Sequence, residues 1–245
     1  MKHELTRPPD LLHETHMGPK RVQRPDYVSL LPPCNAACPA GENIQAWLAL
    51  VIEKRYKAAW QALVEENPLP AVHGRVCYHP CESGCNRNQL DSPVSIHAVE
   101  RFIGDRAIKN GWQVEWPPVA GGKRVLIVGA GPSGLSAAYH LTRLGHSVEI
   151  HEAGPTAGGM MHFGIPAYRM PRDILDAEIR RIEEMGVSIV LNHKGEDLLA
   201  ERDAGKVDAV FVAIGALISK HIDSPARDAG KMVDAGCFLA RVVAG

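Results

Sequence analysis

The segment Arg124–Gly134 constrains the fold of this chain more than any other. An apolar run, RVLIV, leads directly into the glycine pattern G-x-G-x-x-G and then into residues of helical periodicity. A strand that passes through a glycine-rich turn into a helix is typical of a dinucleotide-binding βαβ unit. In such a unit Gly129 permits the tight turn, Gly131 lets a pyrophosphate approach the backbone, and Gly134 lets helix and strand pack closely. The sequence therefore predicts a Rossmann-type unit at this point.

An acidic residue at the end of the next apolar strand completes the predicted site. Glu152 lies 23 residues after Gly129, a spacing that suits a carboxylate accepting hydrogen bonds from a ribose diol. Free N–H groups at the helix start would hold the pyrophosphate. Because a carboxylate disfavours a 2′-phosphate, we expect FAD or NAD rather than NADP at this loop. The predicted cofactor-binding residues of the loop and strand are Gly129, Ala130, Gly131, Pro132, Ser133, Gly134 and Glu152.

Hydrophobic periodicity divides the chain into two kinds of structure. Helical spacing in the N-terminal half predicts helices over 42–54, 57–66 and 95–110. Beyond the Pro- and Gly-rich linker 116–122, strands over 124–128, 147–151, 187–191 and 209–214 alternate with helices over 132–144 and 172–185. This alternation predicts a parallel sheet. We therefore expect an α/β protein, with an all-α N-terminal domain and then a Rossmann-type sheet domain that is incomplete.

Composition excludes some classes of function and points to a metal or redox cofactor. The chain has 27 basic and 28 acidic residues and no Lys/Arg tract, so we expect no nucleic-acid partner. With no apolar leader and no apolar run long enough to cross a bilayer, the expected location is the cytoplasm. Five of the six cysteines lie between Cys34 and Cys85. In a reducing compartment, such a cluster favours metal or cofactor ligation over disulfides.

Two further motifs resemble a known family. The segment Gly158–Pro171, GGMMHFGIPAYRMP, is similar to a flavin-wrapping segment of the glutamate synthase small (beta) subunit family, also found in the N-terminal half of dihydropyrimidine dehydrogenase. The cysteine strings CNAACP, from Cys34, and CYHPCESGC, from Cys77, resemble the iron–sulfur domain of the same family. By matching position, the resemblance implies that Gly159 and Met160 lie near the ribityl–pyrophosphate of FAD and Arg169 near the FAD.

The resemblance also implies a ligand set for one [4Fe–4S] cluster. Members normally hold two clusters, but the first two family cysteines fall at Asp26 and Ser29 in this chain. We therefore expect one cluster, with Cys38, Cys77 and Cys81 as ligands and Glu100, Cys34 or Cys85 as the fourth. Zinc is the alternative, although four-thiolate zinc sites usually use C-x2-C pairs rather than the C-x3-C spacing seen here.

The family pattern predicts four segments: an extended arm over 1–33, an α-helical iron–sulfur domain over 34–118, the N-terminal part of an FAD domain over 119–220, and a C-terminal helix or link over 221–245. No second glycine fingerprint follows. NAD(P)H binding is therefore expected only with a domain or partner outside this chain. We favour an N-terminal portion of a longer flavoprotein over complementation by a partner subunit.

The function implied is electron transfer between NAD(P)H-reduced FAD and the [4Fe–4S] cluster, in an NAD(P)H-dependent oxidoreductase that this chain alone does not complete. No side chain is expected to be catalytic, since the cofactors carry the chemistry. The expected partner is an oxidoreductase subunit, either similar to the glutamate synthase large subunit or another electron acceptor. The alternatives are a non-catalytic docking scaffold and a zinc-containing NAD-binding protein.

Overall fold

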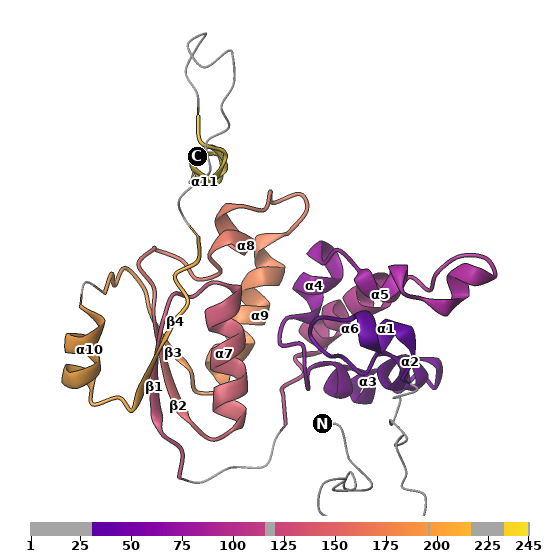
Figure 1. The fold of residues 1–245 in the computed structure, drawn as a ribbon, viewed down its shortest axis with the longest axis horizontal. Helices are drawn as coiled ribbons and strands as arrows, with labels where there is room; N and C mark the ends of the chain where they lie inside the picture. Colours follow the sequence, from indigo (N-terminus) through magenta and orange to yellow (C-terminus); the bar gives the residue numbers. More distant parts are fainter. Residues whose placement is uncertain (1–30, 116–120, 196, 217–232, 245) are drawn as a thin grey trace, which may run out of the picture. The chain divides into compact units, whose positions relative to one another are not determined.

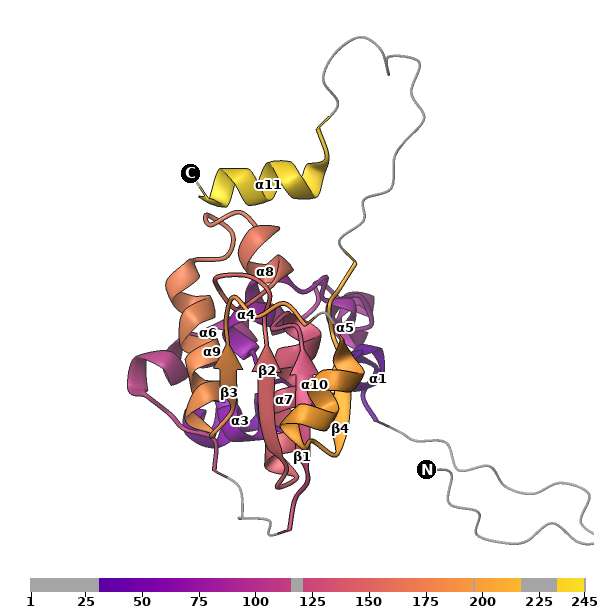
Figure 2. The same ribbon diagram turned by 90° about the vertical axis from the view of Figure 1, so that its left-hand side faces the viewer.

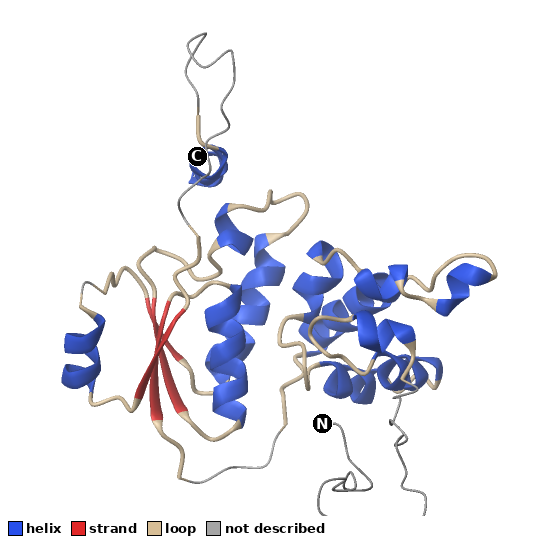
Figure 3. Cartoon of the chain, viewed as in Figure 1, coloured by secondary structure: helices blue, strands red, loops and turns tan. Residues whose placement is uncertain are grey.

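The computed structural model describes residues 31–115, 121–195, 197–216 and 233–244 (Figures 1 and 3). The N-terminal part is helical, with α1 (Pro33–Ala37), α2 (Ile44–Ile52), α3 (Tyr56–Leu63), α4 (Pro70–Val76), α5 (Pro80–Ser83), the 3-10 helix η1 (Asn86–Gln89) and α6 (Ile96–Asn110). The remainder alternates strands and helices: β1 (Arg124–Val128), α7 (Pro132–Arg143), β2 (Ser147–His151), α8 (Met160–Phe163), α9 (Arg172–Glu184), β3 (Ser188–Val190), α10 (Leu198–Gly205), β4 (Ala209–Val212) and α11 (Ala235–Ala244).

The four strands form a parallel sheet in the order β3-β2-β1-β4 (Figure 2). Helices α7 and α9 cover one face of the sheet, and α10 lies on the other (Figures 1 and 2). Residues Val125–Val128 of β1 are all buried, whereas β2 alternates buried Val148 and Ile150 with exposed neighbours. The buried run and the alternation explain why both strands have the predicted bounds. A helical N-terminal part followed by a parallel α/β sheet confirms the predicted fold class.

The helical part packs through one close helix crossing. Gly104 of α6 faces α4 so closely that a Cβ atom there would lie 2.5 Å from the backbone nitrogen of Ala71. Helix α6 ends at Gly111, which has φ +61°, the left-handed conformation that commonly ends helices. The buried side chains around the crossing include Trp47, Trp60 and Ile103. This core holds the short cysteine-bearing segments in place.

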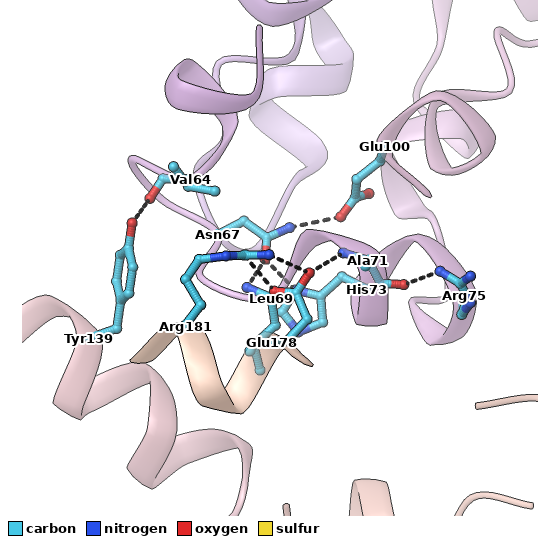
Figure 4. Close-up of polar contacts among 10 residues, drawn as sticks. All are labelled: Val64, Asn67, Leu69, Ala71, His73, Arg75, Glu100, Tyr139, Glu178 and Arg181. Carbon is cyan, nitrogen blue, oxygen red and sulfur yellow. Dashed lines mark hydrogen bonds and ion pairs between the residues drawn. The ribbon is translucent and has the colours of Figure 1, made fainter. Parts of the chain in front are cut away.

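The helical part and the sheet part meet at a buried polar junction between α4 and α9 (Figure 4). The backbone N–H of Ala71 donates to Oε1 of Glu178 at 3.2 Å, and Arg181 donates to Oε2 of the same carboxylate at 2.9 Å. From α7, the hydroxyl of Tyr139 donates to the carbonyl of Val64 at 2.6 Å. Glu178 is fully buried. The junction therefore fixes the cysteine-bearing helices relative to the sheet.

Several short helices were not expected from the sequence. They are α1, α4, α5, α8 and α10, each of four to eight residues. Segments this short show too few periods for a hydrophobic pattern. The composition of the segment around α8 predicts a loop. This prediction is wrong for Met160–Phe163, which form a short helix. The predicted C-terminal helix is present as α11. Most of the N-terminal arm with Asp26 and Ser29, residues 116–120 of the linker and residues 217–232 lie outside the described part of the chain.

Candidate functional site

The glycine loop after β1 leaves room where a phosphate group would approach. A Cβ atom on Gly134 would lie 1.9 Å from the carbonyl oxygen of Gly129, and one on Gly129 would lie 2.4 Å from that of Ala213. These two glycines are therefore required by packing. Nothing lies within 4 Å of the Cβ position of Gly131, and no side chain caps the first turn of α7, which begins with Pro132. The open backbone and the uncapped helix start fit an anion such as a pyrophosphate.

Glu152, at the end of β2, supports the loop directly. Its Oε2 accepts a hydrogen bond from the N–H of Ala130 at 2.7 Å, and its Oε1 accepts one from the N–H of Gly154 at 2.8 Å. An ionised carboxylate offers about four acceptor positions. Two are used here, so the side chain keeps capacity for a ribose diol. The structure thus adds to the predicted ribose contact a second role, which is to hold the glycine loop.

The segment that resembles a flavin-wrapping loop packs on the glycine loop. Gly159 has φ +52°, and a Cβ atom there would lie 2.9 Å from Cα of Gly131. The N–H of Gly158 donates to the carbonyl of Ala130 at 2.8 Å. Met160 begins α8 with an exposed side chain. Two stretches predicted separately to contact the cofactor are therefore in direct contact.

Three of the predicted cluster ligands influence one another electrostatically. Burial, with a further contribution from the neighbouring Cys38 and Cys77 thiols, raises the pKa of the Cys81 thiol to about 12. Burial also raises the pKa of Cys38, although backbone N–H groups of Glu42, Ala40 and Gly41 oppose the shift. Cys77, at the end of α4, accepts a hydrogen bond from the N–H of His79 at 3.4 Å. Such thiols become thiolates only with a positively charged partner, so this donor set fits metal or cluster ligation.

The other two cysteines of the group come from the helix pair α1 and α5. Cys34 lies in α1, and Cys85 directly follows Gly84 at the end of α5. These helices are in contact, since a Cβ atom on Gly84 would lie 3.2 Å from that of Ala37. Cys237, by contrast, is exposed on α11. The structure therefore gathers all five N-terminal cysteines around α1, α4 and α5.

Glu100 lies in a buried polar network with Asn67 (Figure 4). Its Oε1 accepts a hydrogen bond from Nδ2 of Asn67 at 2.7 Å, and the same nitrogen donates to Glu42 at 2.8 Å. Burial, followed by the nearby Glu42 carboxyl, holds the pKa of Glu100 well above its ordinary value. Its role as fourth ligand stays a prediction. Asn67 was not predicted as a site residue, because an asparagine before a proline is typical of a helix end.

Arg169 has a small electrostatic effect on a residue near the cysteine group. Its side chain is exposed, yet its charge helps to lower the pKa of His79, after the larger effects of burial and of His97. His79 is two residues from Cys77 in the cysteine group. The charge of Arg169 therefore acts on a residue close to the predicted cluster ligands.

Within the described ranges, no helix combines the length and apolar character needed to cross a bilayer.

Two family models match separate segments of the chain. Residues 28–112 match the family model described as dihydropyrimidine dehydrogenase domain II, 4Fe-4S cluster, and residues 127–175 match an NAD(P)-binding Rossmann-like domain. The chain is 39% identical over 221 residues to the NADP(+)-dependent formate dehydrogenase subunit beta of Moorella thermoacetica, covering 81% of this chain and 31% of that protein. It is 40% identical to the NADPH-Fe(3+) oxidoreductase subunit beta of Geobacter sulfurreducens, covering 81% and 30%.

A further relative carries the name that the sequence motifs indicated. Glutamate synthase [NADH] of Schizosaccharomyces pombe is 36% identical over 195 residues, which cover 78% of this chain and 9% of that protein. The chain thus spans about a third or less of the length of these three relatives. Over the segment that these matches cover, the chain is similar to glutamate synthase and to the beta subunits of these two enzymes.

Proposed function

We propose that this chain is the iron–sulfur and FAD-binding part of an NAD(P)H-dependent electron-transfer oxidoreductase. The observation that carries the proposal is the packing of Gly159 on Gly131, together with the hydrogen bond that joins Ala71 of α4 to Glu178 of α9. Helix α4 ends at Cys77, so the part that carries the nucleotide loop also contacts a helix that carries a thiol. A protein that passes electrons between two cofactors needs such a connection.

The residues have separate roles in this proposal. Gly131 and the N–H groups at the start of α7 bind the pyrophosphate of FAD, Glu152 accepts from its ribose, and Met160 and Arg169 lie along the cofactor. Cys38, Cys77 and Cys81 hold one [4Fe–4S] cluster, with Glu100, Cys34 or Cys85 as the fourth ligand. Bound there, the two groups would supply the exchange between two-electron and one-electron chemistry. Burial around Cys81 keeps water away from the thiolates.

The proposal includes a division of the chain and a partner. The cluster domain covers 34–118 and the FAD domain 119–220, with NAD(P)H bound by a further domain or subunit. Because two of the relatives are named beta subunits, we propose that a partner oxidoreductase subunit takes the electrons. It would be similar to the glutamate synthase large subunit or another acceptor.

Cofactor content after anaerobic purification tests the proposal. We expect about four iron atoms per chain, bound FAD, and visible absorption that dithionite bleaches. A colourless protein with one zinc ion per chain and no flavin would contradict the proposal and support the zinc-containing alternative. A folded protein with neither metal nor flavin would support a docking scaffold, for which the absent thiols at Asp26 and Ser29 are the motivation.

A further inference from the structure

A group of side chains that can bind a metal lies at the carboxyl end of the sheet, beside Glu152 of the nucleotide site. We call it the histidine–glutamate cluster: His151 at the end of β2, His193 in the loop after β3, and Glu201 in α10. One ligand atom from each residue lies within 4.8 Å of the others. The proposed electron-transfer function uses none of the three side chains.

The spacing within the cluster suits a shared ion better than direct hydrogen bonds. Nδ1 of His151 lies 3.4 Å from Oε2 of Glu201, and Nε2 of His193 lies 3.4 Å from Oε1 of the same carboxylate. Both distances exceed the usual N–H···O length of about 2.7–3.2 Å. Nitrogen and oxygen ligands about 2.1 Å from a tetrahedral zinc ion are roughly 3.4 Å apart. Each histidine nitrogen therefore lies about as far from one oxygen of Glu201 as two ligands of such an ion, His151 from Oε2 and His193 from Oε1.

A second carboxylate orients His151. Its other ring nitrogen, Nε2, lies 2.8 Å from Oε1 of Glu149. A histidine that ligates a metal usually donates its remaining N–H to such a group, which fixes the ring and makes the ligand nitrogen more basic. Glu149, two residues earlier on β2, occupies this outer position. His151 thus lies between two carboxylates, with Glu201 on the side of the proposed ion and Glu149 on the other side. This arrangement is typical of a metal-ligating histidine.

The backbone holds the loop of His193 in place. The N–H of His193 donates to the carbonyl of Glu152 at 2.8 Å, and that of Asn192 donates to the carbonyl of Gly154 at 2.9 Å. A Cβ atom on Gly195 would lie 2.8 Å from Oε1 of Glu201, so the loop passes close to the carboxylate. The side chain of His151 is 13% exposed and that of His193 is 43% exposed. The cluster is thus preformed on one side and open to solvent on the other.

We propose that the histidine–glutamate cluster binds one divalent transition-metal ion, with zinc as the best fit. Two imidazoles and one carboxylate suit Zn²⁺ and similar ions, while Mg²⁺ and Ca²⁺ prefer all-oxygen sites. Three protein ligands leave a fourth position for water or another ligand. The ion would tie α10 and the loop of His193 to the end of β2, next to Glu152.

A second histidine–glutamate group offers a matched control. His79, Glu82 and His97 also bring ligand atoms within 4.8 Å of one another. There, Nδ1 and the backbone N–H of His97 both donate to the same oxygen of Glu82, at 2.7 and 3.0 Å. The ring centroids are close in both groups, 3.9 Å apart for His79 and His97 and 4.1 Å apart for His151 and His193, so the hydrogen bonds are the feature that differs. Direct hydrogen bonds already satisfy that oxygen, so we expect no comparable metal affinity.

Zinc titration of the anaerobically purified chain tests the proposal. We expect one tightly bound Zn²⁺ that is lost in His193→Ala and in Glu201→Gln but retained in His97→Ala. Glu149→Gln should weaken binding about 10–100-fold, since it removes only the outer partner of His151. Circular dichroism and thermal unfolding of each variant without zinc check that the fold is intact.

Zinc-edge X-ray absorption distinguishes this site from the thiols. We expect nitrogen and oxygen neighbours at about 2.0–2.1 Å and no sulfur at about 2.3 Å. Zinc that shows sulfur neighbours and persists in His193→Ala would be bound by cysteines and would overturn the proposal. Absence of tight zinc binding to the parent chain, or its loss in His97→Ala alone, would also overturn it.

Discussion

The sheet part and the helical part of this chain reach a defined structure by different means. In the sheet part, long elements pack apolar faces together: α7 and α9 have 12 and 13 residues and cover a buried strand. In the helical part, α1, α4 and α5 have only 5, 7 and 4 residues. Elements this short gain little from their own hydrogen bonds. They depend on ligands and on polar contacts that come from elsewhere in the chain.

Buried polar groups show the same contrast. Around the short helices, Asn67 donates to Glu42 and Glu100 and accepts from the N–H of Leu69. Nδ1 of His73 lies 2.7 Å from the same amide oxygen. The core residues of β1 and β2 are apolar. Since an unpaired buried polar group costs free energy, such a network specifies one arrangement of the segments that carry it. The short helices that carry the cysteines therefore depend more on specific hydrogen bonds between buried polar groups than β1 and β2 do.

Cys81→Ser should have the largest effect on the helical part, because it removes a buried thiol that we propose as a cluster ligand. We expect the iron content to fall from about four atoms per chain to nearly none. Hydrogen exchange should speed up around α1, α4 and α5, while the amides of β1 and β2 stay protected. Iron analysis and hydrogen exchange by mass spectrometry measure both effects. Cys237→Ser, at an exposed position on α11, is the control. Unchanged iron in Cys81→Ser would exclude it as a ligand.

Glu178→Ala tests the junction that joins the two parts. Removing the carboxylate leaves the buried guanidinium of Arg181 without its partner and the N–H of Ala71 without an acceptor. Breaking a buried ion pair in this way costs about 3–5 kcal/mol of the free energy of unfolding. Urea unfolding measures the loss. Glu183→Ala, on the exposed face of the same helix, should change it by less than about 0.5 kcal/mol. Equal effects in the two variants would mean that the junction contributes little.

Gly134→Ala and Gly131→Ala separate packing from binding within the sheet part. The added Cβ of Gly134→Ala meets the carbonyl of Gly129, so we expect a loss of about 3 kcal/mol. Gly131→Ala meets nothing within 4 Å, and φ at this residue is −76°, which alanine adopts freely. Its stability should change by less than about 0.5 kcal/mol. Flavin content should nevertheless fall, because the methyl group occupies the approach of the pyrophosphate. Full flavin retention in Gly131→Ala would argue against a cofactor at this loop.

How much the sequence predicts follows the same division. The predicted bounds of β1 and β2 are those observed, because a buried run and an alternating run have clear periods. The glycine fingerprint also predicted which glycines need close packing. The short helices α4 and α5 were missed, since their positions depend on thiols and on partners distant in sequence. For the same reason the sequence did not reveal that Glu100 shares Asn67 with Glu42, or that Glu152 holds the loop of Ala130.

Tyr139→Phe should cause a smaller loss of stability than Glu178→Ala, because it removes a single hydrogen bond between the two parts. The hydroxyl on α7 donates to the carbonyl of Val64 in the helical part at 2.6 Å, and burial raises the pKa of Tyr139 to about 12, so the group stays a neutral donor. Removing it leaves a carbonyl unsatisfied while the aromatic ring keeps its packing, at a cost of about 1–2 kcal/mol. Tyr168→Phe, at an exposed position, should have no measurable effect. Urea unfolding compares the two variants. If Tyr139→Phe is as stable as the parent, the hydroxyl contributes nothing to the junction. Apolar packing and the contacts of Glu178 would then hold the helical part and the sheet part together.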